Sequence, residues 1–385
     1  MRIALLSWES LHSIAVGGVA VHVTELAAAL ERKGHEVHVY TRMRWPGDWQ
    51  YHRIDGVHYH RVPYSGAADI VDDVNNMCRG FVASVFHTED YMGAHFDIVH
   101  AHDWMASNAM VWIKQGRGRK GILTIHSTEY GRCGNNFYGG RSARIRDHER
   151  HGTFCADRVI TVSQALKNEI QWMYNVPDWK ASVVHNGICY WHFDGWVDPA
   201  AIKARYSIGP VDPTVLFVGR MTSQKGPDLL VEAVPFVVRY HPSAKFIFTG
   251  EGDMKGYVER RAWELGVKHA CRFYGVFPRG ELIDLYKACD CVCVPSRNEP
   301  FGIVILEAWA AGKPVVSTMN GAEFVWHDVN GYRIYPNPDS IAWGIGTLFA
   351  DFEHGRWMGR NGRKAVETAF SWDTIAEHTL GVYNS

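Results

Sequence analysis

The sequence predicts a two-domain α/β protein in which each domain is built around a parallel β-sheet. The chain has 385 residues, more than a single hydrophobic core usually organises. Strand-like and helix-like segments alternate along almost its whole length, which is typical of parallel sheets. A stretch rich in glycine and proline at 206–213 interrupts this alternation, which restarts at Thr214. We therefore expect one domain on each side of that stretch.

The first half begins with a short apolar segment from Ile3 to Ser7, which we expect to form a buried strand. The pair Gly17 and Gly18 then precedes a helical pattern that Gly34 is placed to end. Further strands are predicted at 36–41, 57–62, 97–102, 121–127, 158–163 and 182–186. Several of them end in a polar residue before a helix, and ligands of doubly wound sheets bind at such carboxyl ends.

The second half repeats the alternation. Strands are predicted at 214–220, 245–250, 271–275, 290–295 and 314–318, with helical patterns between them. An amphipathic pattern from about Ser371, built on Trp372, Ile375 and Leu380, predicts a final helix. These patterns predict an N-terminal domain over 1–208 and a C-terminal domain over 209–369, followed by a helix in 370–385.

The composition excludes several classes of protein. Apolar residues make up 46% and charged residues 21%, as in ordinary soluble proteins, and the net charge of −1 argues against a dedicated nucleic-acid binder. No apolar run approaches the ~20 residues that span a bilayer, and no apolar stretch of a secretory signal opens the chain. The eight cysteines lack a disulfide-framework spacing. We expect a cytoplasmic protein.

The loop after the first strand of the second half carries two cations. In Gly219-Arg-Met-Thr-Ser-Gln-Lys-Gly226, Arg220 and Lys225 lie between a strand end and a helix start. Cations beside the free backbone amides of a helix start make a site for a diphosphate. The alternative is an ordinary strand-to-helix loop with solvated charges.

A second motif follows the predicted strand 290–295. Glu299 precedes Gly302, where backbone can approach a ligand closely, and Glu307 comes eight residues after Glu299, about two turns into the next helix. A carboxylate at that position suits hydrogen bonding to ribose hydroxyls. Taken alone, each residue has another interpretation, Glu299 as a helix cap and Glu307 as a surface residue.

Together these two motifs resemble the retaining nucleotide-sugar glycosyltransferases of the GT-B fold, with compact glycogen and starch synthase-like enzymes as the most similar type. The pattern is Gly-Arg-x4-Lys-Gly, then Pro-Ser-x-x-Glu-Pro-Phe-Gly-x4-Glu-Ala. Stretches of the first half that also match are the glycines at 17–18, His-Ala-His-Asp-Trp at 100–104, Leu-Thr-Ile-His-Ser-Thr-Glu-Tyr-Gly at 123–131, Ala-Asp-Arg-Val-Ile-Thr-Val-Ser at 156–163 and Asn-Gly at 186–187. The resemblance implies two Rossmann-like domains facing each other across a deep cleft. The ending Phe-Ser-Trp-Asp at 370–373 implies that the last helix packs back on the first domain.

The resemblance also implies roles for individual residues. Arg220 and Lys225 would neutralise the donor diphosphate, and His126 would lie beside the transferred sugar. Glu299 would hold sugar hydroxyls, and Asp103 would orient sugar or acceptor. The residues implied in binding the nucleotide sugar are Gly17, Gly18, Arg220, Lys225, Phe301, Gly302, Ile303 and Glu307.

No cofactor and no metal are expected. The other common glycosyltransferase architecture holds a divalent ion with an Asp-x-Asp pair, which does not occur in this sequence. Arg220 and Lys225 can supply the cationic charge instead, so we expect activity to survive EDTA. The run Cys289-x-Cys291-x-Cys293 favours small buried side chains on one face of a strand over a zinc site.

By this resemblance we expect transfer of a glucosyl group from ADP- or UDP-glucose to an α-glucan. The alternative acceptors are a lipid, a sugar phosphate or a cell-envelope glycan. Ala15 stands where bacterial glycogen synthases carry the lysine of Lys-x-Gly-Gly, so the donor base is not fixed. An aromatic loop at 43–51 is either an acceptor platform or local packing. The arginines of 141–150 favour a solvated helix face over a site for an anionic acceptor or a peripheral membrane contact, because Asp147 and Glu149 interrupt them. A non-catalytic binder, a phosphorylase or an epimerase on the same scaffold is the rival class.

Overall fold

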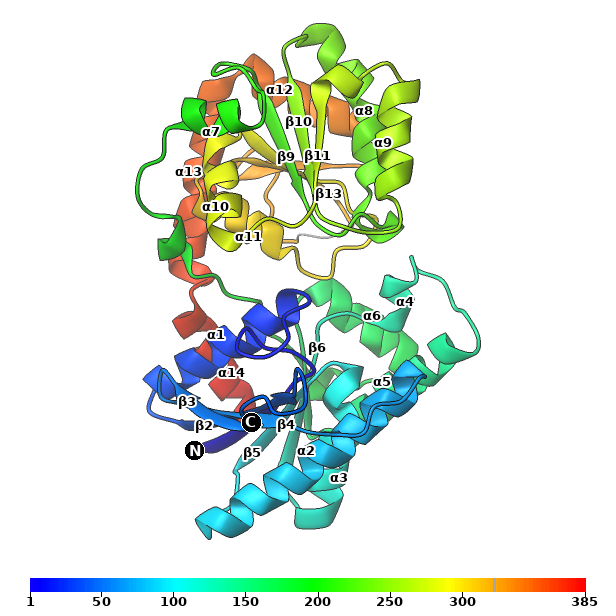
Figure 1. Ribbon diagram of the computed structural model, residues 1–385, viewed down its shortest axis with the longest axis vertical. Helices are drawn as coiled ribbons and strands as arrows, with labels where there is room; N and C mark the ends of the chain where they lie inside the picture. Colours follow the sequence, from blue (N-terminus) through cyan, green and yellow to red (C-terminus); the bar gives the residue numbers. More distant parts are fainter. Residues whose placement is uncertain (321–322) are drawn as a thin grey trace. The chain divides into compact units, whose positions relative to one another are not determined.

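The computed structural model describes residues 1–320 and 323–385 and divides the chain into two compact units (Figure 1). Unit 1 comprises Met1–Asn186 and Trp372–Ser385, and unit 2 comprises Gly187–Ser371. The division falls at residue 186, earlier than the predicted boundary at 208. Residues after 186 pack on unit 2: Lys203 Nζ donates to Asp290 at 2.9 Å. The stretch rich in glycine and proline at 206–213 is thus a loop inside unit 2 and no domain linker.

Unit 1 contains an eight-stranded sheet, counted over the described residues, in the order β3-β4-β2-β1-β5-β6-β7-β8. Neighbouring strands are parallel, except that β3 runs antiparallel to β4 at one edge. The strands are β1 (Arg2–Leu6), β2 (Glu36–Arg42), β3 (Tyr51–Ile54), β4 (Val57–Val62), β5 (Ile98–His102), β6 (Lys120–Ile125), β7 (Arg158–Thr161) and β8 (Ala181–Val183). The middle strands bury side chains on both faces, as sheets covered by helices do.

The helices of unit 1 are α1 (Gly18–Arg32), α2 (Ile70–Met92), α3 (Trp104–Arg117), α4 (Glu129–Arg132), α5 (Arg141–Cys155), α6 (Gln164–Tyr174), the 3-10 turn η1 (Asp178–Lys180) and α14 (Trp372–Tyr383). Local signals set their ends: the Asp69 side chain accepts from two amides at the start of α2, and Gly93 ends it in the left-handed conformation. The final helix α14 packs against α1, where Arg32 and Asp373 form an ion pair at 2.6 Å.

Unit 2 contains a parallel sheet in the order β11-β10-β9-β12-β13-β14 over its described residues. Its strands are β9 (Thr214–Val218), β10 (Lys245–Thr249), β11 (Cys271–Tyr274), β12 (Cys291–Val294), β13 (Val315–Thr318) and β14 (Gly331–Ile334). Its helices and 3-10 turns are η2 (Tyr190–Phe193), α7 (Pro199–Arg205), η3 (Ser223–Lys225), α8 (Pro227–Tyr240), α9 (Lys255–Glu264), η4 (Lys268–Ala270), α10 (Arg279–Ala288), α11 (Ile303–Ala310), α12 (Pro338–Ala350) and α13 (Phe352–Ala369).

The core of unit 2 forms where apolar strand residues meet the helices that cover the sheet. Cys291 and Cys293, two apart on β12, lie in this core with Val215 and Phe246. Both thiols belong to the apolar cluster, and burial raises the pKa of each well above its ordinary range. Across the described part of the chain, no helix has the length and apolar character needed to cross a lipid bilayer.

Candidate functional site

The loop at 219–226 in unit 2 connects β9 to α8 and is held by the neighbouring loop after β10. Gly219 N donates to Thr249 O at 3.1 Å, and Met221 N donates to Glu251 O at 2.9 Å. A Cβ added at Gly250, where φ is +131°, would lie 2.0 Å from Gly219 O. Only glycine allows this approach of two backbones, so the loop that carries Arg220 and Lys225 has a fixed base.

Lys225 and Glu299 form the central ion pair of this loop region. Lys225 Nζ lies 2.8 Å from Glu299 Oε1 and 2.7 Å from Oε2, and Ser296 Oγ donates to Glu299 Oε2 at 2.9 Å. Glu299 is buried. Gly226, at φ +66°, lets the loop meet the end of β12, because a Cβ there would lie 2.2 Å from Pro295 O. The carboxylate and the ammonium group are therefore placed together at the carboxyl ends of β9 and β12.

Arg220 lies in the same loop but is exposed. Its Nη2 donates to Gln224 Oε1 at 3.3 Å. For the residues that the structure describes, no ion pair or hydrogen bond joins Arg220 to Glu299 or Glu307. The guanidinium is thus a cation whose charge is not neutralised by a carboxylate contact, in contrast to Lys225.

Glu307 lies in α11 and takes a different partner. Tyr286 of α10 donates its hydroxyl to Glu307 Oε2 at 2.7 Å. Burial raises the pKa of the Glu307 carboxyl above its ordinary value, and the bond from Tyr286 opposes that shift. At the start of the same helix, Gly302 has φ +92°, which favours glycine, while Phe301 is buried and Ile303 is half-buried. The sequence motif 299–307 therefore spreads over a buried loop and the first turns of a helix.

In unit 1, the glycine loop before α1 is organised by a carboxylate that the sequence analysis did not single out. Glu9 Oε2 accepts from Val16 N at 2.6 Å and from Gly17 N at 2.9 Å. Burial raises the pKa of Glu9, and these amide bonds oppose the shift. Gly17 has ordinary extended backbone (φ −152°) and Gly18 begins α1. In this conformation the Gly17 amide, expected at the diphosphate, binds Glu9.

Asp103 and His126 are joined directly. Asp103 follows β5 with φ +59°, an uncommon conformation for this residue, and its Oδ1 accepts from His126 N at 2.7 Å. Burial raises the pKa of Asp103, against the opposing effect of the Arg132 charge and of backbone amides. Because β5 and β6 are adjacent and parallel, their carboxyl ends bring the two residues together. Asp103 thus fixes the backbone of His126.

A buried charge network supports the segment after His126. Arg132 of α4 donates to Ser127 O at 2.9 Å and pairs with Glu149 of α5 at 2.7 Å. Glu149 also accepts from the Tyr174 hydroxyl. Burial raises the pKa of Glu149 to about 7, with Arg132 opposing the shift. The guanidinium of Arg132 is therefore occupied by its own network.

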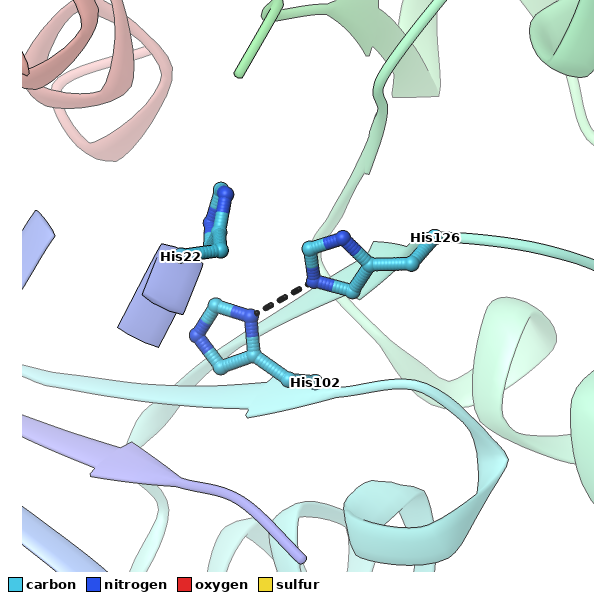
Figure 2. Close-up of side chains that lie close together, drawn as sticks. All are labelled: His22, His102 and His126. Carbon is cyan, nitrogen blue, oxygen red and sulfur yellow. Dashed lines mark hydrogen bonds between the residues drawn. The ribbon is translucent and has the colours of Figure 1, made fainter. Parts of the chain in front are cut away.

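Three histidines converge in unit 1, as Figure 2 shows: His22 from α1, His102 from the end of β5 and His126 after β6. His102 Nδ1 and His126 Nε2 are 3.1 Å apart, and one ligand atom from each ring lies within 4.8 Å of the others. Burial lowers the pKa of His126 to about 3 and the pKa values of His22 and His102 well below their ordinary range. The rings are therefore neutral at pH 7.

The structure thus brings together two pairs of the predicted residues, Lys225 with Glu299 and Asp103 with His126. It gives Glu307 a partner of its own. Functional candidates that sequence reasoning missed are Glu9, His22, Ser296 and Tyr286. Ser296 is within the quoted motif, and His22 follows the glycine pair by four residues; Tyr286 has no local signal because its partner is 21 residues away.

The two segments considered for an acceptor have local partners. In the aromatic loop at 43–51, the Arg61 guanidinium stacks on Trp49 at 3.5 Å and pairs with Asp48, while Trp45 is exposed. In α5, Arg144 pairs with Asp69 and Asp72 at the start of α2. Trp45 remains available to a sugar ring, whereas Arg144 is largely used inside unit 1.

Comparison with known families gives two matches that follow the two halves of the chain. Residues 16–189 match the Glycosyltransferase Family 4 domain, and residues 200–365 match the glycosyl transferases group 1 domain. The first match covers the glycine loop and the three histidines; the second covers Arg220, Lys225, Glu299 and Glu307. The candidate residues of each unit therefore lie in a segment that matches a known family.

Individual relatives match over nearly their whole length. An uncharacterized glycosyltransferase of Methanocaldococcus jannaschii is 40% identical over all of this chain and 98% of its own. A glycogen synthase of Mycobacterium tuberculosis is 29% identical over 100% of this chain and 94% of its own. A D-inositol 3-phosphate glycosyltransferase of Kineococcus radiotolerans is 30% identical over 95% of this chain and 90% of its own.

Solved structures share the architecture at low sequence identity. Sucrose-phosphate synthase from Thermosynechococcus elongatus has a TM-score of 0.83 at 22% identity, covering 100% of this chain and 98% of its own. Anabaena HepE in complex with UDP and glucose has a TM-score of 0.80 at 18% identity, covering 100% and 99%. The predicted fold class, α/β with two parallel-sheet domains, is confirmed by these matches.

Proposed function

Because the chain belongs to the glycosyltransferase group 1 family and has the GT-B fold, we propose that it transfers a glucosyl group from ADP- or UDP-glucose to an α-glucan with retention of anomeric configuration. That the protein is a glycosyltransferase follows from the family itself. The donor, the acceptor and the stereochemistry are the content of the proposal. The glycogen synthase of M. tuberculosis, which aligns with the whole chain, supports the glucan acceptor.

The observation that carries the proposal is the ion pair of Lys225 with Glu299 beside the exposed Arg220. Charge develops on the diphosphate as the bond to the sugar breaks, and fixed cations stabilise it. Lys225 would exchange one carboxylate contact for phosphate oxygens, which leaves Glu299 able to accept from sugar hydroxyls. Ser296 keeps that carboxylate in place during the exchange.

The remaining predicted residues take supporting roles in this proposal. Glu307 would accept from the ribose hydroxyls, in exchange for or in addition to the Tyr286 hydroxyl. Phe301, Gly302 and Ile303 would present backbone at the start of α11. In unit 1, neutral His126 would contact the transferred sugar.

Asp103 would orient sugar or acceptor through the His126 segment that it fixes. The amides of the glycine loop, Gly17 and Gly18, would reach the donor only after Gly17 N leaves Glu9. Since Arg220 and Lys225 supply positive charge, we propose that transfer needs no metal ion and no other cofactor.

The test uses the purified chain with a panel of nucleotide sugars. A donor that binds only the folded state raises the melting temperature, and the donors found in this way are then supplied, radiolabelled, with a glucan primer in EDTA. We expect ADP- or UDP-glucose to stabilise the chain and label to enter the primer. No incorporation with any donor, or incorporation that requires added metal, would contradict the proposal.

A second acceptor class is supported by one specific relative. The D-inositol 3-phosphate glycosyltransferase of K. radiotolerans is 30% identical over 95% of this chain. The same transfer chemistry would then serve a sugar phosphate or polyol phosphate acceptor. Supplying inositol phosphate in place of the primer separates the two, because label would enter a small anionic product and leave the glucan unlabelled.

A non-catalytic role on the same scaffold is disfavoured by the charged groups of the site. A chain that only binds carbohydrate has no need for Arg220, Lys225, Glu299 and Glu307 together, yet all four are present and two of them are in contact. Nor does any visible motif point to the lysine-bound pyridoxal cofactor of a phosphorylase.

A further inference from the structure

The three converging histidines of unit 1 have a property that the proposed transfer reaction does not explain. His22 is 4% exposed and His102 is 1% exposed, and within the described residues neither Nε2 atom has a hydrogen-bond partner. Buried polar atoms without a protein partner are uncommon, and such atoms commonly pair with a bound ion or an ordered water molecule. The unpartnered Nε2 of His22, beside the neighbouring pair of His102 Nδ1 and His126 Nε2, points to a ligand bound there.

A fourth histidine beside the cluster shows what a purely structural ring looks like. His100 is 4.3 Å from His102 between ring centroids. Its Nδ1 contacts the Tyr383 hydroxyl at 2.7 Å and its Nε2 contacts Thr124 Oγ1 at 2.6 Å. Both of its nitrogens are satisfied, so burial alone does not force unpartnered nitrogens in this part of the sheet.

The orientation of His22 is that of a metal ligand. Its Nδ1 lies 2.7 Å from Asn186 Oδ1, which only accepts, so the proton is on Nδ1 and the lone pair of Nε2 faces away from Asn186. Metal-binding histidines commonly donate their second nitrogen to an oxygen in this way, which fixes the tautomer and the ring. Asn186 would be the supporting residue of the site.

The separations also suit an ion. Nitrogens about 2.1 Å from a tetrahedral zinc ion stand about 3.4 Å from one another. His102 Nδ1 and His126 Nε2 are already 3.1 Å apart, and the largest separation among the three ligand atoms is within 4.8 Å. Small ring rotations, mainly of His22, would complete the set.

We propose that His22, His102 and His126 bind one Zn²⁺ ion in unit 1, with Asn186 orienting His22. Three neutral imidazoles and no carboxylate form a donor set that suits zinc and not magnesium or calcium, which prefer oxygen ligands. The fourth position is left to water. A consequence for activity rests on the proposed function: the bound ion takes the His126 side chain away from the sugar and therefore inhibits transfer.

Zinc retention tests the site without reference to activity. The full chain is stripped with EDTA, dialysed, loaded with Zn²⁺ and titrated by calorimetry, and bound metal is counted by plasma mass spectrometry. We expect one zinc per chain, and at least a 10- to 100-fold loss of affinity in His22→Gln, His126→Gln and the supporting variant Asn186→Ala. His95→Gln, at an exposed histidine of unit 1, is the matched control and should bind as the wild type does.

X-ray absorption at the zinc edge covers the case in which a variant misfolds, because it uses the unaltered chain. We expect three imidazole nitrogens about 2.0–2.1 Å from the ion. A first shell containing sulfur, no binding by the wild type, or full binding by His22→Gln and His126→Gln would each overturn the site.

Activity gives a separate reading. We expect added Zn²⁺ to lower transfer, EDTA to restore it, and the inhibition to disappear in His22→Gln. Bound zinc with unchanged turnover would overturn the inhibitory role. Absence of any transfer, with or without EDTA, would instead refute the proposed function and leave the zinc titration to decide the site.

Discussion

The charged candidate residues of unit 2 contrast with the neutral histidine cluster of unit 1. In unit 2 the candidate residues are ions that face one another, as in Lys225 with Glu299, and the exposed Arg220 adds a further cation. In unit 1 the corresponding region is lined by neutral rings, with His22, His102 and His126 buried or half-buried. Unit 2 therefore holds the fixed charges that the proposed reaction needs at the diphosphate, whereas the histidine cluster of unit 1 offers hydrogen-bonding groups without charge.

This difference has a consequence for the response to acid. A histidine whose pKa is lowered on folding binds fewer protons in the folded state than in the unfolded state, so its contribution to stability is lost as the pH falls below about 6.5. Unit 1 holds four such rings in one cluster, His22, His100, His102 and His126. The comparison therefore predicts that mild acid acts first on unit 1.

The largest expected effect is this loss of stability. Each of the four rings costs up to about 1.4 kcal/mol per pH unit below its unfolded pKa, so unit 1 should lose several kcal/mol between pH 7 and pH 5. Hydrogen exchange after incubation at each pH, with a short labelling pulse at one common pH, follows both units in one sample. Equal protection from exchange at pH 5 in β5 and β6 of unit 1 and in β9 of unit 2 would contradict the prediction that acid acts first on unit 1.

The next effect concerns the cation of unit 2. We expect Lys225→Ala to lower kcat about 10²–10³-fold, which is the usual cost of removing one group that stabilises developing charge. The measurement is initial-rate transfer with the donor identified by thermal shift. Lys245→Ala, at the start of β10, is the control and should keep the wild-type rate. A near-normal kcat in Lys225→Ala would remove this residue from the proposed role.

A smaller effect is expected from the partner of Glu307. Tyr286→Phe removes the hydroxyl that donates to this carboxylate at 2.7 Å, and a hydrogen bond to a charged group is worth about 2 kcal/mol. Urea unfolding should show that loss, while Tyr257→Phe, at an exposed tyrosine of α9, should unfold as the wild type does. Unfolding at the same urea concentration in both variants would show that Glu307 does not depend on Tyr286.

The smallest expected effect is the influence of Glu149 on how steeply the unfolding free energy changes with pH. Its pKa is raised to about 7 in the folded state. Between about pH 4.5 and pH 7 the folded chain therefore binds more protons at Glu149 than the unfolded chain does, and the contribution of Glu149 to stability falls as the pH rises. It thus opposes the histidines. Glu149→Gln should make the rise of unfolding free energy between pH 5 and 7 steeper by up to about 1.4 kcal/mol per pH unit. An unchanged slope would show that Glu149 is ionised throughout.

Much of the fold could be predicted from the sequence, because buried parallel strands leave short apolar runs such as 3–7 and 214–218. The edge strand β3 and the last strand β14 were not predicted; β3 pairs by backbone with β4 while three of its four side chains stay exposed, so it lacks the apolar pattern. The domain boundary was predicted late because glycine and proline mark turns of any kind. Composition cannot show that α7 packs on α10 and that its Lys203 bonds to Asp290, just before β12.

Candidate residues could be predicted from the sequence where they belong to a short, continuous motif. Lys225 and Glu299 were found in two short patterns, and the structure adds that they are in contact. The histidine cluster was not predicted, because its members come from three elements and are separated by 80 and 24 residues in the chain. Likewise, Glu9 takes the Gly17 amide through a loop whose path no periodicity describes.

The order in which the chain is made gives the final helix a particular importance. Unit 2 is one continuous stretch, 187–371, whereas unit 1 needs both ends of the chain. During synthesis, residues 187–371 can therefore fold as a complete unit before α14, the last helix of unit 1, has been translated. Only when Tyr383 emerges does His100 gain its phenol partner, so the part of the protein translated first is the last to be finished.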